Sequence, residues 1–122
     1  MQPLNVVLLQ NDSRVAQSLV SALGSSASVC QVKSLGELRN SIAKHIAGIA
    51  ILDMEAASIS DVEHLSREFP KARIICTHRL ADDNMWTAAL NAGAADICPP
   101  SDTRGIVRAA LGDAEMKRSA AA

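Results

Sequence analysis

The chain has 122 residues, of which 48% are hydrophobic, and its 12 basic and 13 acidic side chains give a formal charge of −1. This length and apolar content predict one globular domain with a single core and exclude a disordered chain. The balanced charge excludes an electrostatic footprint for nucleic acid or an anionic membrane. No apolar run reaches the length of a membrane span, and residues 1–9 lack the basic start of a signal peptide. A cytoplasmic location is therefore expected.

Short apolar runs predict five strands, at residues 4–9, 28–32, 49–53, 73–77 and 95–98. Three of these runs are almost continuously apolar, which is typical of strands that are covered on both faces. Segments with helical spacing follow each strand. Their apolar positions are, in chain order, Val15, Leu19 and Leu23; Leu35, Leu38, Ile42 and Ile46; Ile59, Val62, Leu65 and Phe69; Trp86 and Leu90; and Ile106, Val107, Ala110 and Leu111. We expect Trp86, the single tryptophan, to lie in the core.

Signals for helix ends agree with this division. Ser34 and Glu37 form a capping-box signature before the second helix, and Pro70 stops the third. Gly93 ends the fourth helix, and Ser101 and Asp102 cap the fifth. Five such units in a row predict a doubly wound α/β domain, a parallel sheet with helices on both faces and right-handed crossovers. We expect one domain over residues 1–112 and a fraying tail over 113–122, where the pattern is lost.

Cys30, Cys76 and Cys98 form no CxxC pair, and their number is odd. They are predicted to be buried thiols of a reduced compartment. Cys76 and Cys98 should lie on neighbouring strands, which leaves a redox pair as the less favoured alternative.

Polar residues gather where the predicted strands end, the edge at which parallel sheets place their functional crevice. They are Gln10, Asn11 and Asp12 after the first strand, Asp53 at the end of the third, Thr77 and His78 at the fourth, and Pro99 and Pro100 after the fifth. The run GIAILD is unusual because it ends a buried apolar strand on a carboxylate, and an ionised Asp avoids dry surroundings.

The segments LDM, IICTH and NAGAADICPP, taken in order and spacing, resemble the receiver domain of two-component response regulators over about residues 4–111. The resemblance implies a flavodoxin-like sheet with strand order 2-1-3-4-5 and five flanking helices. It places the phosphoacceptor position on Asp53 and the switch hydroxyl on Thr77, and it makes Pro100 a candidate cis-proline.

Several positions depart from the family pattern. They are Gln10 and Asn11 at the acidic pair, Pro99 at the lysine, Ala57 and Asp61 at the proline and glycine after the phosphoacceptor, and Asp96 at the aromatic switch residue. Asp12 takes a third position that is often acidic in the family. Mg²⁺ prefers anionic oxygens, so no cofactor is expected, and a weak Mg²⁺ site would have to draw on Asn11, Asp53 and Glu55.

Asp53 is then either a residual phosphoacceptor or a structural carboxylate that loop amides hold by hydrogen bonds, and we favour the structural role. The pocket rim should comprise Asp12, Glu55, His78 and Arg79. In the receiver geometry Glu55 and Arg79 face each other, and an exposed ion pair between them would contribute about 0.2–1 kcal/mol. His78 is expected to be a solvated loop histidine.

These features favour an atypical receiver, a pseudo-receiver that signals by binding a protein and is not an enzyme. The resemblance places the signalling surface on the fourth helix, fifth strand and fifth helix, where this chain carries Met85, Asp96, Arg104 and Arg108. A second copy of the chain is a further candidate partner. Two alternatives remain: a phosphorelay receiver still phosphorylated on Asp53 with weakened Mg²⁺ binding, and the amino-terminal module of a larger protein such as a pilus-assembly ATPase.

Overall fold

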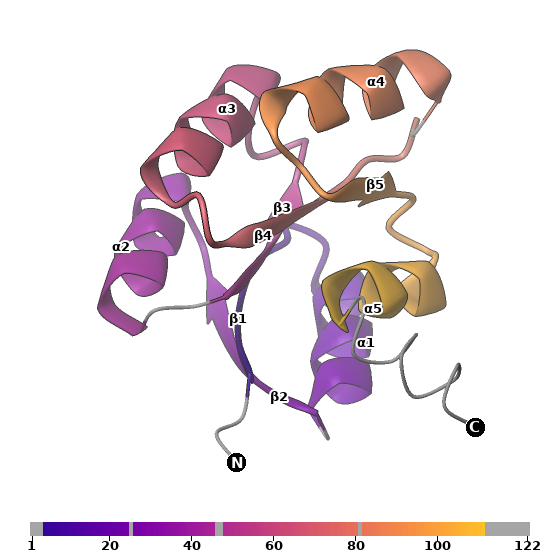
Figure 1. Ribbon diagram of the computed structural model, residues 1–122. Helices are drawn as coiled ribbons and strands as arrows, with labels where there is room; N and C mark the ends of the chain where they lie inside the picture. The colour runs from indigo at the N-terminus through magenta and orange to yellow at the C-terminus, as the bar shows by residue number, and fades with distance from the viewer. Residues whose placement is uncertain (1–3, 25, 46–47, 81, 112–122) are drawn as a thin grey trace, which may run out of the picture.

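A computed structural model describes residues 4–24, 26–45, 48–80 and 82–111, in which five strands alternate with five helices (Figure 1). In chain order they are β1 (Leu4–Leu9), α1 (Ser13–Leu23), β2 (Ala27–Val32), α2 (Leu35–His45), β3 (Ile49–Asp53), α3 (Ile59–Glu68), β4 (Arg73–Thr77), α4 (Asp83–Ala92), β5 (Asp96–Cys98) and α5 (Thr103–Leu111). The strands form one parallel sheet in the order β2-β1-β3-β4-β5. This confirms the α/β fold class and the flavodoxin-like strand order.

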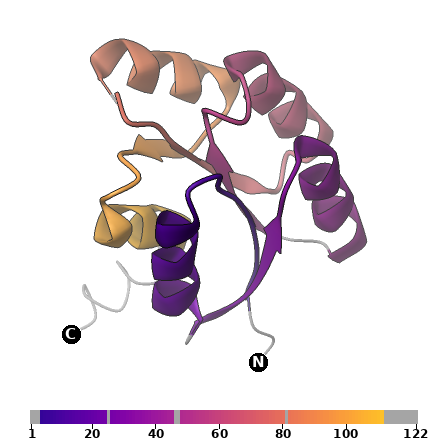
Figure 2. The same cartoon turned by 180° about the vertical axis from the view of Figure 1, so that it is seen from behind.

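The two faces of the sheet carry separate hydrophobic clusters. Helices α1 and α5 lie side by side over one face, and α2, α3 and α4 cover the other (Figures 1 and 2). Leu8, Ile51 and Ile75 point toward α1 and α5, whereas Leu9 and Leu52 point to the opposite face. All five residues of β3 are buried, because it lies at the centre of the sheet with helices on both sides. Asp53, at the carboxyl end of β3, is therefore shielded from solvent.

Most predicted boundaries are confirmed, and the differences have local causes. Strand β2 begins one residue earlier than expected and β5 one residue later. At α2, the Glu37 N–H donates to Ser34 Oγ (3.2 Å), but the Glu37 carboxylate accepts from the Lys33 N–H (3.2 Å) instead of the Ser34 N–H. Gly93 ends α4 at a φ of 111°, a conformation that favours glycine. Ile46 and the tail expected to fray at 113–122 lie outside the described residues.

Three expectations about burial are wrong. Trp86 is 49% exposed, because α4 places the small side chains of Ala89 and Ala92 against the sheet and leaves the indole outside. Met85, expected on the open surface, is half-buried against the cluster beneath α4. Cys30 is exposed, since β2 is an edge strand.

The inward positions of α5 are confirmed in part: Ile106 and Ala110 are buried, but Val107 and Leu111 are half-buried. None of the helices within the described ranges has the length and apolar character needed to span a membrane.

Candidate functional site

The ends of three neighbouring strands bring Gln10, Asp53 and Thr77 into one row. Leu9 pairs with Leu52 across β1 and β3, so Gln10 lies level with Asp53. Asp53 pairs directly with Thr77 across β3 and β4. Side chains alternate along a strand, so this row points to the same face as Leu8 and its neighbours beneath α1 and α5.

Two backbone amides from different loops hold the Asp53 carboxylate. The Asn11 N–H donates to Asp53 Oδ2 (3.2 Å), and the Glu55 N–H donates to Asp53 Oδ1 (2.9 Å). The Asp53 residue is only 2% exposed. Hydrogen bonds to both oxygens offset part of the cost of burying a carboxylate. The contacts expected of a structural carboxylate are therefore present.

Thr77 is fully buried, and its hydroxyl is hydrogen-bonded to the side chain of Gln10, the residue that follows β1. Gln10 Nε2 donates to Thr77 Oγ1 (3.1 Å), and Gln10 Oε1 accepts from the Asp12 N–H (3.2 Å). Asp12 itself caps α1, where its Oδ1 accepts from the Arg14 N–H (2.9 Å). The carboxylate of Asp12 is thus bound to the first turn of α1.

A pocket of about 360 Å³, here called the rim pocket, opens above this row. It is lined by Gln10, Asp12, Val15, Glu55, Arg79, Pro99, Pro100 and Ser101. The expected ion pair is present, since Arg79 Nη2 donates to Glu55 Oε1. Neither Asp53 nor Thr77 lines the rim pocket, so these two residues lie behind Gln10 and the other side chains that line it.

Two expectations about the rim are wrong. His78 does not line the rim pocket: its N–H donates to the Cys98 carbonyl (3.1 Å) and its Nδ1 accepts from the Leu80 N–H (2.9 Å). The main chain of His78 thus continues the contact of β4 with β5, and the ring is half-buried. The peptide bond before Pro100 is trans, as are all peptide bonds of the described chain. Trans is the favoured form of such a bond.

The donor set does not fit a Mg²⁺ site. Within the described ranges, no group of three or more His, Cys, Asp or Glu side chains is placed to hold a metal ion. Both Asp53 oxygens accept hydrogen bonds from backbone N–H groups, and the Glu55 carboxylate is paired with Arg79. The Gln10 side chain turns its NH2 group toward Thr77. Mg²⁺ takes anionic and carbonyl oxygens, and an N–H donor repels it. We therefore derive no chemistry through a metal at this site.

Cys76 and Cys98 cannot form a redox pair. Thr77 is the residue that pairs with Cys98, so Cys76 and Cys98 point to opposite faces and belong to different hydrophobic clusters. Burial raises the pKa of the Cys76 thiol to about 12. Burial, with the nearby Asp96 and Asp102 carboxylates, raises the pKa of Cys98 to about 11. The thiolate is the reactive form, so we expect both thiols to react slowly while the domain is folded.

Sequence reasoning missed two features. The Gln10–Thr77 hydrogen bond joins residues 67 positions apart, and no local pattern signals it. The capping box lies at α3, where Ser58 Oγ accepts from the Asp61 N–H (3.2 Å) and the Asp61 carboxylate accepts from the Ser58 N–H (2.9 Å). The Ser-x-x-Asp spacing was the signal for it. Asp61, which departs from the family pattern, thus has a structural role.

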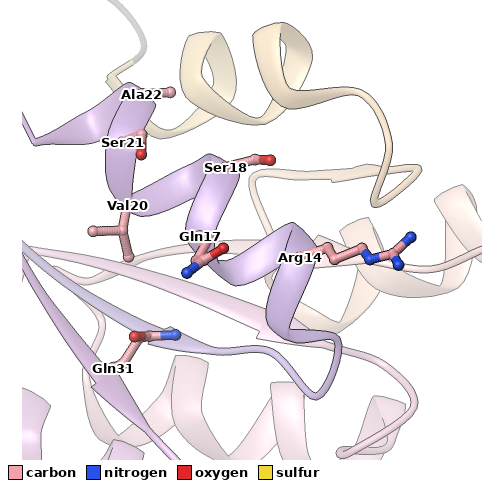
Figure 3. Close-up of a pocket in the computed structure, with 7 residues that line it drawn as sticks. All are labelled: Arg14, Gln17, Ser18, Val20, Ser21, Ala22 and Gln31. Atoms are coloured by element: carbon pink, nitrogen blue, oxygen red, sulfur yellow. The ribbon is translucent and has the colours of Figure 1, made fainter.

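A larger open groove, of about 960 Å³, runs along α1 beside the edge strand β2 (Figure 3). Gln17 and Val20 point toward Gln31 of β2, whereas Ser18 and Ala22 point to another side of the helix. The groove therefore follows the outer surface of α1 and contains no cluster of catalytic groups.

Comparisons with known proteins agree on the fold. No protein-family model and no curated protein sequence matches the chain. The signal receiver domain of the putative response regulator NarL from Mycobacterium tuberculosis superposes with a TM-score of 0.77 at 20% identity, over 95% of this chain and 98% of that one. A response regulator from Burkholderia pseudomallei with a phosphorylated aspartic acid and a calcium ion gives a TM-score of 0.76 at 18% identity, over 98% of this chain and 73% of that one.

A chain of the CheX–CheY–BeF3–Mg²⁺ complex from Borrelia burgdorferi gives a TM-score of 0.77 at 17% identity, over 89% of this chain and 87% of that one. The chain has the fold of response-regulator receiver domains.

Proposed function

We propose that this chain is an atypical, non-enzymatic receiver domain that acts in signal transduction by binding a protein partner. Control by phosphorylation of Asp53 is lost or much reduced. The observation that carries the proposal is the state of the Asp53 carboxylate, which is 2% exposed and accepts backbone N–H groups at both oxygens. A nucleophilic carboxylate has to reach its phosphodonor, and this one is enclosed.

The charges around Asp53 support the same proposal. Transfer of a phosphoryl group to a carboxylate needs a cation to offset the charge that grows on the phosphoryl oxygens. One carboxylate about 4 Å from a cation contributes on the order of 4 kcal/mol per unit charge at an effective dielectric constant near 20. Gln10 and Asn11 are neutral, so neither provides a carboxylate to hold this cation. Pro99 has neither the positive charge nor the N–H donor that a lysine would provide.

We place the partner surface on α4, β5 and α5. Leu80, just before α4, is 72% exposed, and Trp86 on α4 is 49% exposed; these are the large exposed hydrophobic residues among those described. Arg104 and Arg108 on α5 are also exposed. Exposed Trp and Arg side chains are enriched at protein interfaces and at their energetic centres. A second copy of the chain is a candidate for this surface, and a cytoplasmic location, with the thiols reduced, belongs to the proposal.

The test of phosphorylation is the intact mass after incubation with acetyl phosphate, with and without Mg²⁺, beside an Asp53→Asn control. Circular dichroism first establishes that both proteins are folded. We expect no gain in mass in any sample. A Mg²⁺-dependent gain of one phosphoryl group that the control lacks would contradict the proposal that phosphorylation control is lost. It would support a phosphorelay receiver instead.

The test of self-association is sedimentation velocity of the wild-type chain and of Trp86→Ala. If a second copy binds the α4–β5–α5 surface, the wild-type chain sediments as a dimer and the variant as a monomer. A wild-type monomer at all concentrations excludes the second copy and leaves a different protein as the partner.

A further inference from the structure

The hydrogen bond between Gln10 and Thr77 crosses the end of a third strand. Gln10 follows β1 and Thr77 ends β4, and these two strands are separated by β3. Neighbouring strands lie about 4.8 Å apart, so the ends of β1 and β4 are about 9.6 Å apart. The bond from Gln10 Nε2 to Thr77 Oγ1 therefore passes over the row position held by Asp53. The Gln10 side chain therefore runs from the strand on one side of Asp53 to the strand on its other side.

We propose that the Gln10 carboxamide is a strap that fixes the Thr77 hydroxyl, joins the strand ends without a cation and keeps the Asp53 carboxylate closed. The proposal rests on the proposed function, since it explains how the domain can hold one fixed conformation with no phosphoryl group. The strap is anchored at both ends: Oε1 accepts from the Asp12 N–H (3.2 Å), and Nε2 donates to Thr77 (3.1 Å).

A glutamine suits this place because it carries a donor and an acceptor without charge. A glutamate at position 10 would bring a second carboxylate beside that of Asp53, and two neighbouring carboxylates repel each other. A methionine would keep the length of the side chain but could bind neither Asp12 nor Thr77. The methionine variant therefore tests the hydrogen bonds of the strap, and the glutamate variant tests its lack of charge.

Burial explains why the strap fixes Thr77. The residue is fully buried, and the bond from Gln10 is the hydrogen bond that the structure shows for its hydroxyl. Threonine has few allowed χ1 rotamers, and each one sends the hydroxyl in a different direction. With Gln10 present, one rotamer keeps the hydroxyl bonded. Without it, no rotamer retains this partner, and the preference among rotamers weakens.

The experiment measures the χ1 rotamer of Thr77 by three-bond couplings to its methyl carbon in isotope-labelled protein, with no metal and no phosphodonor. The variants are Gln10→Met and, as a matched control, Gln17→Met on the exposed surface of α1. We expect couplings of a single rotamer for the wild-type chain and for Gln17→Met, and averaged couplings for Gln10→Met. Gln10→Met loses two hydrogen bonds, but water can replace the one to the exposed Asp12 N–H, so the folded-to-unfolded ratio should fall about tenfold, the size expected for the lost bond to buried Thr77. An unchanged single rotamer in Gln10→Met, or averaging already in the wild-type chain, overturns the strap.

A second measurement tests the neutrality of the strap, with Mg²⁺ alone as the probe. In Gln10→Glu, Mg²⁺ should shift the amide resonances of Asn11 and Glu55 at concentrations that leave the wild-type resonances unchanged. An equal response in the two proteins overturns the claim that the strap replaces a cation.

The outcomes distinguish this proposal from the proposed function. If acetyl phosphate modifies Asp53 but Thr77 is released only in Gln10→Met, the proposed function fails and so does the closing of Asp53, whereas the fixing of Thr77 by Gln10 stands. If Asp53 stays unmodified and Gln10→Met leaves Thr77 fixed, the strap alone fails.

Discussion

Replacing Asp53 with alanine tests whether its carboxylate stabilises the fold. The substitution removes the acceptor of the Asn11 N–H (3.2 Å) and of the Glu55 N–H (2.9 Å). Hydrogen bonds to a charged acceptor contribute about 1.5–3 kcal/mol each, or about 3–6 kcal/mol together. Asn11 and Glu55 are exposed, so water can rebind their amides, and the variant no longer buries a charge. Because both effects reduce the cost, we expect a loss of about 2 kcal/mol in the free energy of unfolding, less than the sum for the two bonds.

Urea unfolding, followed by far-ultraviolet circular dichroism, measures this loss. With a denaturant dependence of about 2 kcal/mol per molar urea, the midpoint should fall by about 1 M at unchanged slope. Asp53→Asn keeps one acceptor oxygen and should lose about half as much. The matched control is Asp82→Ala, which removes an exposed carboxylate that accepts from the Met85 N–H (2.9 Å) at the start of α4. A cap of this kind contributes about 1 kcal/mol.

An Asp53→Ala variant that is as stable as the wild-type chain, or more stable, would refute the reasoning, provided that Asp82→Ala shows its own loss. The carboxylate would then be kept at a cost in stability, as expected of a group retained for chemistry.

Four further predictions follow from burial and capping. At pH 8 a thiol-specific reagent should modify Cys30 rapidly, whereas Cys76 and Cys98 react only after unfolding, since both are buried with raised pKa values. The Cys76 thiol is protonated in both states below its ordinary pKa of 9.0; as the pH rises toward about 12 the unfolded chain ionises first, so alkaline titration should lower the free energy of unfolding. Iodide should quench the fluorescence of half-exposed Trp86, and Trp86→Ala should cost less than the roughly 3–5 kcal/mol of a buried tryptophan, as urea unfolding would show. Ser58→Ala should cost about 1 kcal/mol by the same assay, because it removes the cap of α3.

The order of elements was predictable because it depends on residues close together in the chain. A strand such as β3 is a continuous apolar run, and Gly93 ends α4 through its own backbone conformation. The position of Asp53 at the edge of the sheet followed from the same patterns, since the carboxyl ends of parallel strands share one edge. Even the pairing of Glu55 with Arg79 was accessible once the receiver geometry was assumed.

Errors arose where a pattern leaves the direction of a side chain open. Trp86 occupies an apolar position of α4, but the helix packs through Ala89 and Ala92, and the indole lies outside. Cys76 and Cys98 were correctly placed on neighbouring strands, yet the register puts Thr77 opposite Cys98 and sends the two thiols to different faces. A shift of one residue in register turns every side chain to the other face, and an apolar pattern does not specify the register of a strand such as β4 that is buried on both faces.

The sequence by itself determined the five strand–helix units, their parallel arrangement and the neutral side chains of Gln10, Asn11 and Pro99 after β1 and β5, because spacing and residue type act within a few positions of the chain. Only the tertiary structure decided what those side chains contact. The contact of Gln10 with Thr77 joins residues 67 positions apart, and it forms because packing brings the ends of β1, β3 and β4 into one row. Such a contact depends on the geometry of the whole sheet, which no single segment encodes.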